Sequence, residues 1–290
     1  MDVDSLAVVV KAVAYAALLQ GVGTALFVAI FASRLDAATP VVKRLGMVAC
    51  AIGLAAALAS YLLEAGRMTG ELAGVMDQAT HRRLAHLPLA AATSLRILGG
   101  TLVIFGLAWR AGEAIVLAVI GSVLVTGSFL LVGHSVTHEP RWLVVALLQW
   151  HLLVVAFWVG SIVPLILVAR REAAVVSHKL VERFSALATV LVPAMAIAGL
   201  AMGWTLDGGR YSIRDPYTAA LTGKVALLVV ALALAALNRA RLGPALREGS
   251  KPAVRRFSLS LIVEFVVLLG IVVLTATMSS LFSPPMAGAS

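Results

Sequence analysis

Three histidines lie close together within residues 127–165, and two of them fall inside apolar runs. His134 and His138 are four residues apart, so on a continuous helix they would share one face. Such a pair can chelate a transition metal through its imidazole nitrogens, with the adjacent Glu139 as an oxygen ligand or as the partner of a ligand. The alternative is a pair of interfacial histidines in contact with water and lipid headgroups.

The third histidine, His151, lies about ten residues into the next apolar run, which is roughly 15 Å along a helix. An imidazole in hydrocarbon needs a polar partner. It can continue a ladder of metal ligands that runs inward from His138 through His134. It can instead hydrogen-bond a backbone carbonyl, Gln149 or Ser161. The residues leave both interpretations open.

Four charged residues also fall within or at the ends of apolar runs, namely Glu64, Arg96, Lys224 and Glu264. Charges in a bilayer are rare, and they are usually paired or functional. The sequence predicts the partners Glu64–Arg96 and Lys224–Glu264, the second pair offset in depth by roughly 8–12 Å. Each pair can be a structural ion pair or can serve in gating or proton coupling.

The elements that must position these residues are transmembrane helices. Of the 290 residues, 61% are hydrophobic and only 13% are charged, whereas a soluble domain is about half apolar and a quarter charged. A spanning helix needs roughly 20 apolar residues. The sequence predicts an all-α integral membrane protein, a single transmembrane domain over 1–290 in contact with the lipid bilayer. Its eight predicted helices cover about 6–33, 42–64, 88–109, 113–134, 141–169, 184–205, 217–240 and 257–281.

The basic residues predict the orientation of this bundle. The net charge of +9 would suggest a nucleic-acid partner in a soluble protein, but most loop Lys and Arg residues here lie in alternate loops. The excess rests mainly on the fifth and seventh loops, with Arg170, Arg171, Lys179, Arg183, Arg239, Arg241, Arg247, Lys251, Arg255 and Arg256. Positive loops stay in the cytoplasm, so both termini are predicted to face outward.

With this orientation, every histidine except His178 falls on the outer side. His81 and His86 lie in the polar segment 65–87, which predicts a short amphipathic helix at the outer surface. Met68 and Met76 lie in the same segment, and their thioethers are further candidate ligands for a soft metal ion.

The remaining motifs do not predict an enzyme. The sequence has no Walker motif, no G-x-S-x-G, no H-E-x-x-H and no C-x-x-C, so neither nucleotide use nor nucleophilic catalysis is expected. Trp142 suits an outer aromatic belt. Trp150 and Trp158 are predicted to be packing residues rather than a stack on a cofactor.

The order and spacing of several segments resemble the CopD/PcoD family of bacterial copper-resistance inner-membrane proteins. The resemblance covers residues of about 127–285. It rests on GHSVTH with QWHLLVVAFWVGSIVPL, then RFSALATVLVPAMAIAGL, YTAALTGKVALL with LNRARLGPAL, and finally RRFSLSLIVEFVVLLG with TATMSSLFSPP.

This resemblance implies copper homeostasis at the cytoplasmic membrane of a bacterium, with import of copper from the periplasm. It implies a separate periplasmic copper-binding partner similar to CopC, because this chain contains no such domain. The family's pattern maps onto His134, His151, Lys224 and Glu264. Imidazole suits either copper oxidation state and thioether favours Cu(I), so both states stay open.

Two other functions remain alternatives. Histidines on neighbouring helices could ligate haem, as in a cytochrome b-like membrane oxidoreductase. His134 and His151 on directly packed helices are poorly placed on opposite sides of a porphyrin. A scaffold or sensor that binds copper without moving it is the third possibility.

Overall fold

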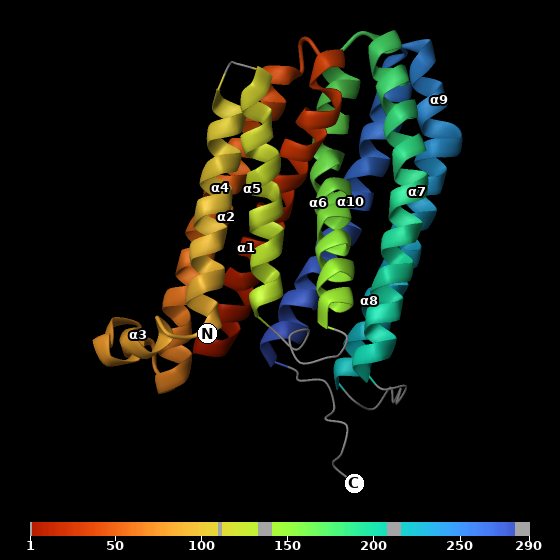
Figure 1. Ribbon diagram of the computed structural model, residues 1–290. Helices are drawn as coiled ribbons and strands as arrows, with labels where there is room; N and C mark the ends of the chain where they lie inside the picture. Colours follow the sequence, from red (N-terminus) through yellow and green to blue (C-terminus); the bar gives the residue numbers. More distant parts are fainter. Residues whose placement is uncertain (1, 110–111, 133–140, 208–215, 282–290) are drawn as a thin grey trace.

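The computed structural model describes residues 2–109, 112–132, 141–207 and 216–281, and every regular element among them is a helix (Figure 1). The helices are α1 (Val3–Phe31), α2 (Thr39–Thr69), α3 (Gln78–Leu84), α4 (Pro88–Ala108), α5 (Ile115–Gly127), α6 (Arg141–Arg171), α7 (Ala174–Asp207), α8 (Pro216–Leu237), α9 (Gly243–Ala245) and α10 (Lys251–Leu281).

Within these described ranges, eight helical runs are long and apolar enough to cross a membrane. This confirms the predicted all-α membrane bundle. α7 begins at Ala174 rather than near residue 184, because its first turns carry polar residues that an apolar-run criterion leaves out. The predicted surface helix within 65–87 is α3, whose N-terminus is capped by Asp77. Hydrogen bonds from Thr80 hold the pKa of the Asp77 carboxyl below its usual value.

The N-terminus and the end of α10 lie at the same end of the bundle, here called the terminal end (Figure 1). The opposite end, called the basic end, carries Arg170 and Arg171 at the end of α6 and Arg239 just after α8. α3 projects sideways at the terminal end. A chain that crosses the membrane an even number of times ends on the side where it began, and the eight candidate spans of the described residues agree with this.

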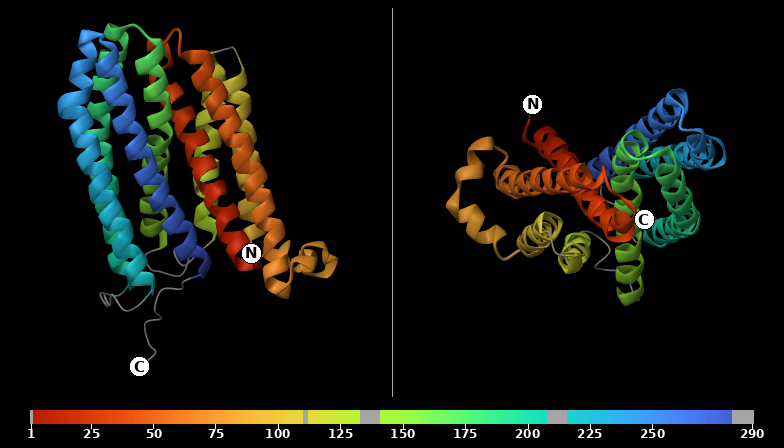
Figure 2. Two further views of the ribbon diagram at one scale, coloured as in Figure 1. Left: turned by 180° about the vertical axis from the view of Figure 1, so that it is seen from behind. Right: turned by 90° about the horizontal axis from the view of Figure 1, so that it is seen from above.

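The bundle has two halves that meet at α1 and α6. α1, α2, α4 and α5 form one half, and α6, α7, α8 and α10 form the other (Figure 2). The halves pack where Gly23 of α1 faces Gly160 of α6. A Cβ built on Gly160 would lie 2.5 Å from the Gly23 Cα, so the two backbones approach as closely as glycine allows.

A proline explains the hydrogen bonds at this crossing. Pro164 has no N–H, so the carbonyl of Gly160, four residues earlier, lacks its helical donor. Gln20 Nε2 donates to this carbonyl at 3.0 Å and Thr24 Oγ1 donates to it at 3.1 Å. The two polar side chains of α1 are buried and satisfy a backbone group that lipid could not satisfy.

The close approach predicts that Gly160→Ala destabilises the protein. The added methyl group meets the α1 backbone, which cannot move without separating the halves, and such overpacking costs about 1–3 kcal/mol. Thermal unfolding of purified protein in detergent should show a lowered midpoint. The matched control is Gly223→Ala in α8, where the nearest atom to the new Cβ is 3.6 Å away. Equal midpoints for the two variants would contradict the packing at the crossing.

Candidate functional site

The second half of the bundle contains two partly open cavities that follow one another along α6, α7, α8 and α10. The His151 cavity has a volume of about 240 Å³ and lies nearer the terminal end. The Glu264 cavity has a volume of about 340 Å³ and lies nearer the basic end. Both are lined mostly by apolar side chains. Few of their lining residues are polar.

His151 is fixed by one hydrogen bond across the interface of α6 and α7. Its Nδ1 lies 3.1 Å from the backbone carbonyl oxygen of Met195. A carbonyl oxygen only accepts, so the imidazole must donate from Nδ1, and in a neutral ring the Nε2 lone pair is then free. A histidine that ligates a metal usually donates its other ring nitrogen in this way. The predicted alternative of a carbonyl partner is therefore confirmed, and it leaves Nε2 able to bind a metal.

The ring has room at this place because α7 carries a glycine opposite it. A Cβ at Gly199 would lie 2.9 Å from His151 Cε1, closer than real Cβ contacts allow. Gly199 therefore permits the imidazole to lie against α7 while it reaches the Met195 carbonyl.

Two methionines of α7 line the same cavity as His151. Met195 and Met202 are both buried, and with Gly199 they are spaced by four and then three residues, which places them along one helical face. Thioether sulfur is a soft ligand that favours Cu(I). These two residues were not among the predicted ligands. Their helical spacing in the sequence could have identified them as candidate ligands, because it places both on one face of a helix that packs against His151.

Lys224 of α8 also lines the His151 cavity. The structure gives its ammonium group no hydrogen-bond or ion-pair partner among the residues it describes. The predicted Lys224–Glu264 pair is therefore not formed. The two residues line different cavities, and the depth offset expected from sequence is not bridged by their side chains.

Glu264 is held by two neutral donors instead. Trp158 Nε1 donates to one carboxylate oxygen at 2.8 Å, and Asn238 Nδ2 donates to the other at 2.7 Å. Asn238 opens a π-helical turn, Asn238–Leu242, that follows α8. Such turns interrupt the regular helix and are frequent at functional sites. Both oxygens of a carboxyl group in the bundle interior are thereby satisfied.

Trp158 separates the two cavities. Its side chain is buried and lines both of them. The indole N–H is bonded to Glu264 on the basic-end side, so the position of the ring depends on that carboxylate. The sequence predicted only a packing role for Trp158, and the structure adds this polar contact.

The predicted Glu64–Arg96 ion pair is also replaced by other contacts. Glu64 pairs with Arg67 at 3.1 Å, one turn along α2. Arg96 donates from Nε to the Ser128 hydroxyl at 3.0 Å, and its guanidinium lies 4.7 Å from the centre of the Phe129 ring. Both residues line one cavity at the terminal end, but each has a nearer partner than the other.

The remaining predicted ligands that the structure describes do not line the His151 cavity. His81 Nε2 is 2.7 Å from the Val75 carbonyl, and His86 is exposed near the end of α3. Met68 and Met76 are exposed at the terminal end. His134, His138 and Glu139 lie outside the described residues. Among the residues that the structure does describe, no three His, Cys, Asp or Glu side chains form a group that could hold a metal ion.

The fold and these cavities define a multi-pass helical membrane protein with an imidazole and thioethers in a cavity between helices. Two family profiles match the chain. "Copper resistance protein D-like, N-terminal domain" matches residues 1–142, and "Copper resistance protein D" matches residues 178–278. No match was found among curated proteins or among solved structures. The chain belongs to the CopD family of copper-resistance membrane proteins.

The contact between Trp158 and Glu264 predicts the effect of a conservative substitution. Trp158→Phe keeps an aromatic ring but leaves one carboxylate oxygen without its donor, which costs about 1–2 kcal/mol. Thermal unfolding in detergent should show a lowered midpoint. Trp150→Phe is the control on the same helix, because Trp150 is 42% exposed. If both variants unfold at the wild-type midpoint, the indole does not support Glu264.

Proposed function

We propose that this protein transports copper from the periplasm to the cytoplasm across the inner membrane of a bacterium. The terminal end would face the periplasm and the basic end the cytoplasm, in agreement with the distribution of Lys and Arg. The family supports a role in copper resistance. The observation that carries the transport proposal is the His151 cavity, with its free Nε2 and two thioethers inside the bundle.

Copper would first be collected at the terminal end. His81, His86, Met68 and Met76 are on that side of the bundle, and the undescribed His134 and His138 belong to the connection between α5 and α6. A periplasmic copper-binding protein similar to CopC is the proposed donor. Exposed imidazole and thioether groups can exchange copper with such a partner without a rigid site of their own.

The His151 cavity would then hold the ion within the membrane. One imidazole with the sulfurs of Met195 and Met202 is a soft ligand set, so we propose that the transported form is Cu(I). A cation beside the Lys224 ammonium is unfavourable. Loss of one proton from Lys224 as Cu(I) binds would keep the charge of the cavity unchanged. Copper would thus exchange for a proton at this position.

Passage toward the basic end would require Trp158 to move. Beyond it, Glu264 offers the first carboxylate in the path. A cation that reaches the Glu264 cavity gains a counter-charge when the indole N–H releases the carboxylate oxygen. Such a transporter uses ion gradients rather than chemistry on a substrate, so the protein is proposed not to be an enzyme.

Removal of the proposed ligand is the direct test. His151→Ala should abolish copper uptake into proteoliposomes that contain the purified protein. His178→Ala is the matched control, because His178 lies at the basic end and contacts the Gly243 carbonyl at 3.4 Å. Unchanged uptake by His151→Ala would remove this residue from the path. A Soret band with stoichiometric iron in the purified protein would favour haem binding instead.

A second substitution tests the orientation of the ring rather than its presence. Gly199→Ala places a methyl group against His151 Cε1 and shifts the imidazole away from the Met195 carbonyl. Loss of such an orienting bond typically weakens metal binding about 10-fold or more. Titration of the purified protein with Cu(I) against a competing chelator measures this change. Gly223→Ala serves again as control, and equal affinities for the two variants would contradict a role for Nε2.

A further inference from the structure

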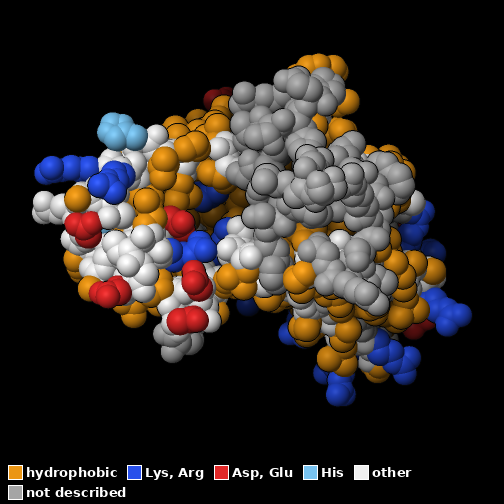
Figure 3. All heavy atoms as spheres, turned by 90° about the horizontal axis from the view of Figure 1, so that it is seen from below, with side chains coloured by type: hydrophobic (Ala, Val, Ile, Leu, Met, Phe, Trp, Pro, Cys, Tyr) orange, Lys and Arg blue, Asp and Glu red, His pale blue; other side chains and the backbone are white. Residues whose placement is uncertain are grey.

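A third cavity lies at the terminal end, in contact with the first half of the bundle. It is partly open and is lined mainly by residues of α1, α2, α4 and the end of α10, and its volume is about 210 Å³. We call it the Arg96 cavity. Its polar lining residues are Lys11, Tyr15, Ser60, Glu64, Arg67 and Arg96, together with the two serines at the end of α10. Seen from this end, acidic and basic side chains gather on the α3 side of the face (Figure 3).

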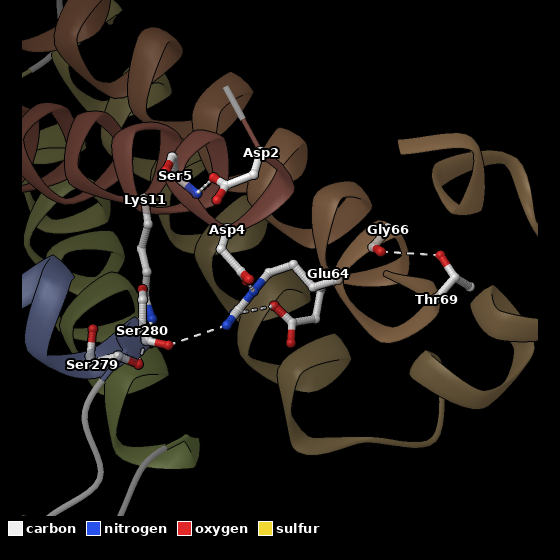
Figure 4. Close-up of polar contacts among 10 residues, drawn as sticks. Asp2, Asp4, Ser5, Lys11, Glu64, Gly66, Thr69, Ser279 and Ser280 are labelled. Carbon is white, nitrogen blue, oxygen red and sulfur yellow. Dashed lines mark hydrogen bonds and ion pairs between the residues drawn. The ribbon is translucent and has the colours of Figure 1, made fainter. Parts of the chain in front are cut away.

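The carboxylates near this cavity are both engaged by one cation. Arg67 Nε donates to Asp4 at 2.8 Å, and its Nη1 donates to Glu64 at 3.1 Å (Figure 4). Its Nη2 donates to the Ser280 carbonyl at 3.2 Å. Arg67 is therefore satisfied on every nitrogen of its guanidinium. It ties the beginning of α1 and the ends of α2 and α10 together.

The other two cations have no carboxylate within ion-pair distance among the described residues. Lys11 Nζ donates to the Ser279 carbonyl at 3.0 Å and lies 5.9 Å from the centre of the Tyr15 ring. Arg96 uses only Nε, in its bond to Ser128, although the residue is 6% exposed. Within the described ranges, the remaining N–H groups of the two side chains have no hydrogen-bond acceptor, and the Arg96 guanidinium lies over the Phe129 ring. Cations in this position normally have an anionic partner.

The lining of the Arg96 cavity also contains two hydroxyl groups without a hydrogen-bond partner among the described residues. The Oγ atoms of Ser60 and Ser280 are buried, and neither has a hydrogen-bond partner in the part of the chain that the structure describes. Both residues line the Arg96 cavity, from α2 and α10 respectively. A buried hydroxyl is rarely left unpaired in a native structure. Two cationic groups and two hydroxyls thus line one space, and the single carboxylate in its lining, Glu64, is bonded to Arg67 rather than to either of them.

From this arrangement we propose that the Arg96 cavity binds a phosphate group. A phosphate oxyanion accepts several charge-assisted hydrogen bonds at once, and arginine and lysine are the side chains that bind it best. The cavity lies among the last turns of α2 and α10 and the first turns of α1, where a bilayer has its headgroups. The same chemistry is offered by inorganic phosphate and by the headgroup of an anionic lipid. This site is independent of the proposed copper path, because Lys and Arg cannot ligate a metal cation while charged.

A phosphate bound in the Arg96 cavity would also stabilise the folded protein. A bound oxyanion would join α1, α4 and α10, which contribute Lys11, Arg96 and Ser280, at the end where the two halves of the bundle meet. A ligand that binds only the folded state raises stability in proportion to its occupancy. Thermal stability is therefore a readout that does not depend on copper transport.

The test measures the thermal midpoint of delipidated protein in detergent. Inorganic phosphate should raise the midpoint in a concentration-dependent manner, compared with chloride at equal ionic strength. Arg96→Gln should reduce the apparent phosphate affinity about tenfold or more, which corresponds to the loss of about 1.4 kcal/mol. Arg34→Gln is the matched control, because Arg34 bonds only the Ile30 carbonyl and is exposed at the basic end.

A second measurement distinguishes the two sources of phosphate. Protein in nanodiscs of phosphatidylglycerol or of phosphatidylcholine is released and examined for retained lipid by native mass spectrometry. Selective retention of phosphatidylglycerol by wild type and Arg34→Gln, but not by Arg96→Gln or Lys11→Gln, identifies a lipid headgroup. A response to inorganic phosphate alone identifies a free anion. If neither phosphate source gives an effect that depends on Arg96 or Lys11, the proposal is overturned.

Discussion

The carbonyl of Gly160 is the constraint on which the arrangement of the bundle depends. Pro164 removes its helical donor, and lipid supplies no substitute. Gln20 and Thr24 of α1 fill this need, and Gly23 lets the two helices approach closely enough for the bonds to form. α6 is thereby fixed against the first half of the bundle. Its other faces are then free to carry His151 and Trp158 toward α7, α8 and α10.

The features that could be predicted from the sequence are those that depend on hydrophobicity and on the order of residues within a short segment. Eight apolar runs predicted eight spanning helices, and the polar segment that precedes Pro88 predicted a short surface helix. Both follow from one-dimensional properties of the chain. The carbonyl partner of His151 was one of two open alternatives, because a lone imidazole in hydrocarbon must find some acceptor. The identity of that acceptor depends on which helix packs against α6.

The pairing of charges could not be predicted, because the partner that each charged side chain finds depends on how the neighbouring helices pack. Lys224 and Glu264 lie on adjacent helices, yet one lines the His151 cavity and the other the Glu264 cavity. Arg67 lies one turn from Glu64 and competes successfully with Arg96 for its carboxylate. Met195 and Met202 were overlooked for a related reason. Their importance comes only from facing a histidine on another helix.

The hydrogen bonds that Glu264 accepts affect how readily the contacts inside the bundle can rearrange. A buried ion pair with Lys224 would hold both charges in place, and breaking it would leave each unpaired at a cost of several kcal/mol. Trp158 and Asn238 are neutral donors, so a rearrangement of their hydrogen bonds would leave no positive charge without its partner. Lys224 stays separate, on the far side of the indole. Two charges of opposite sign are thus kept apart by the buried indole of Trp158, which lines both cavities.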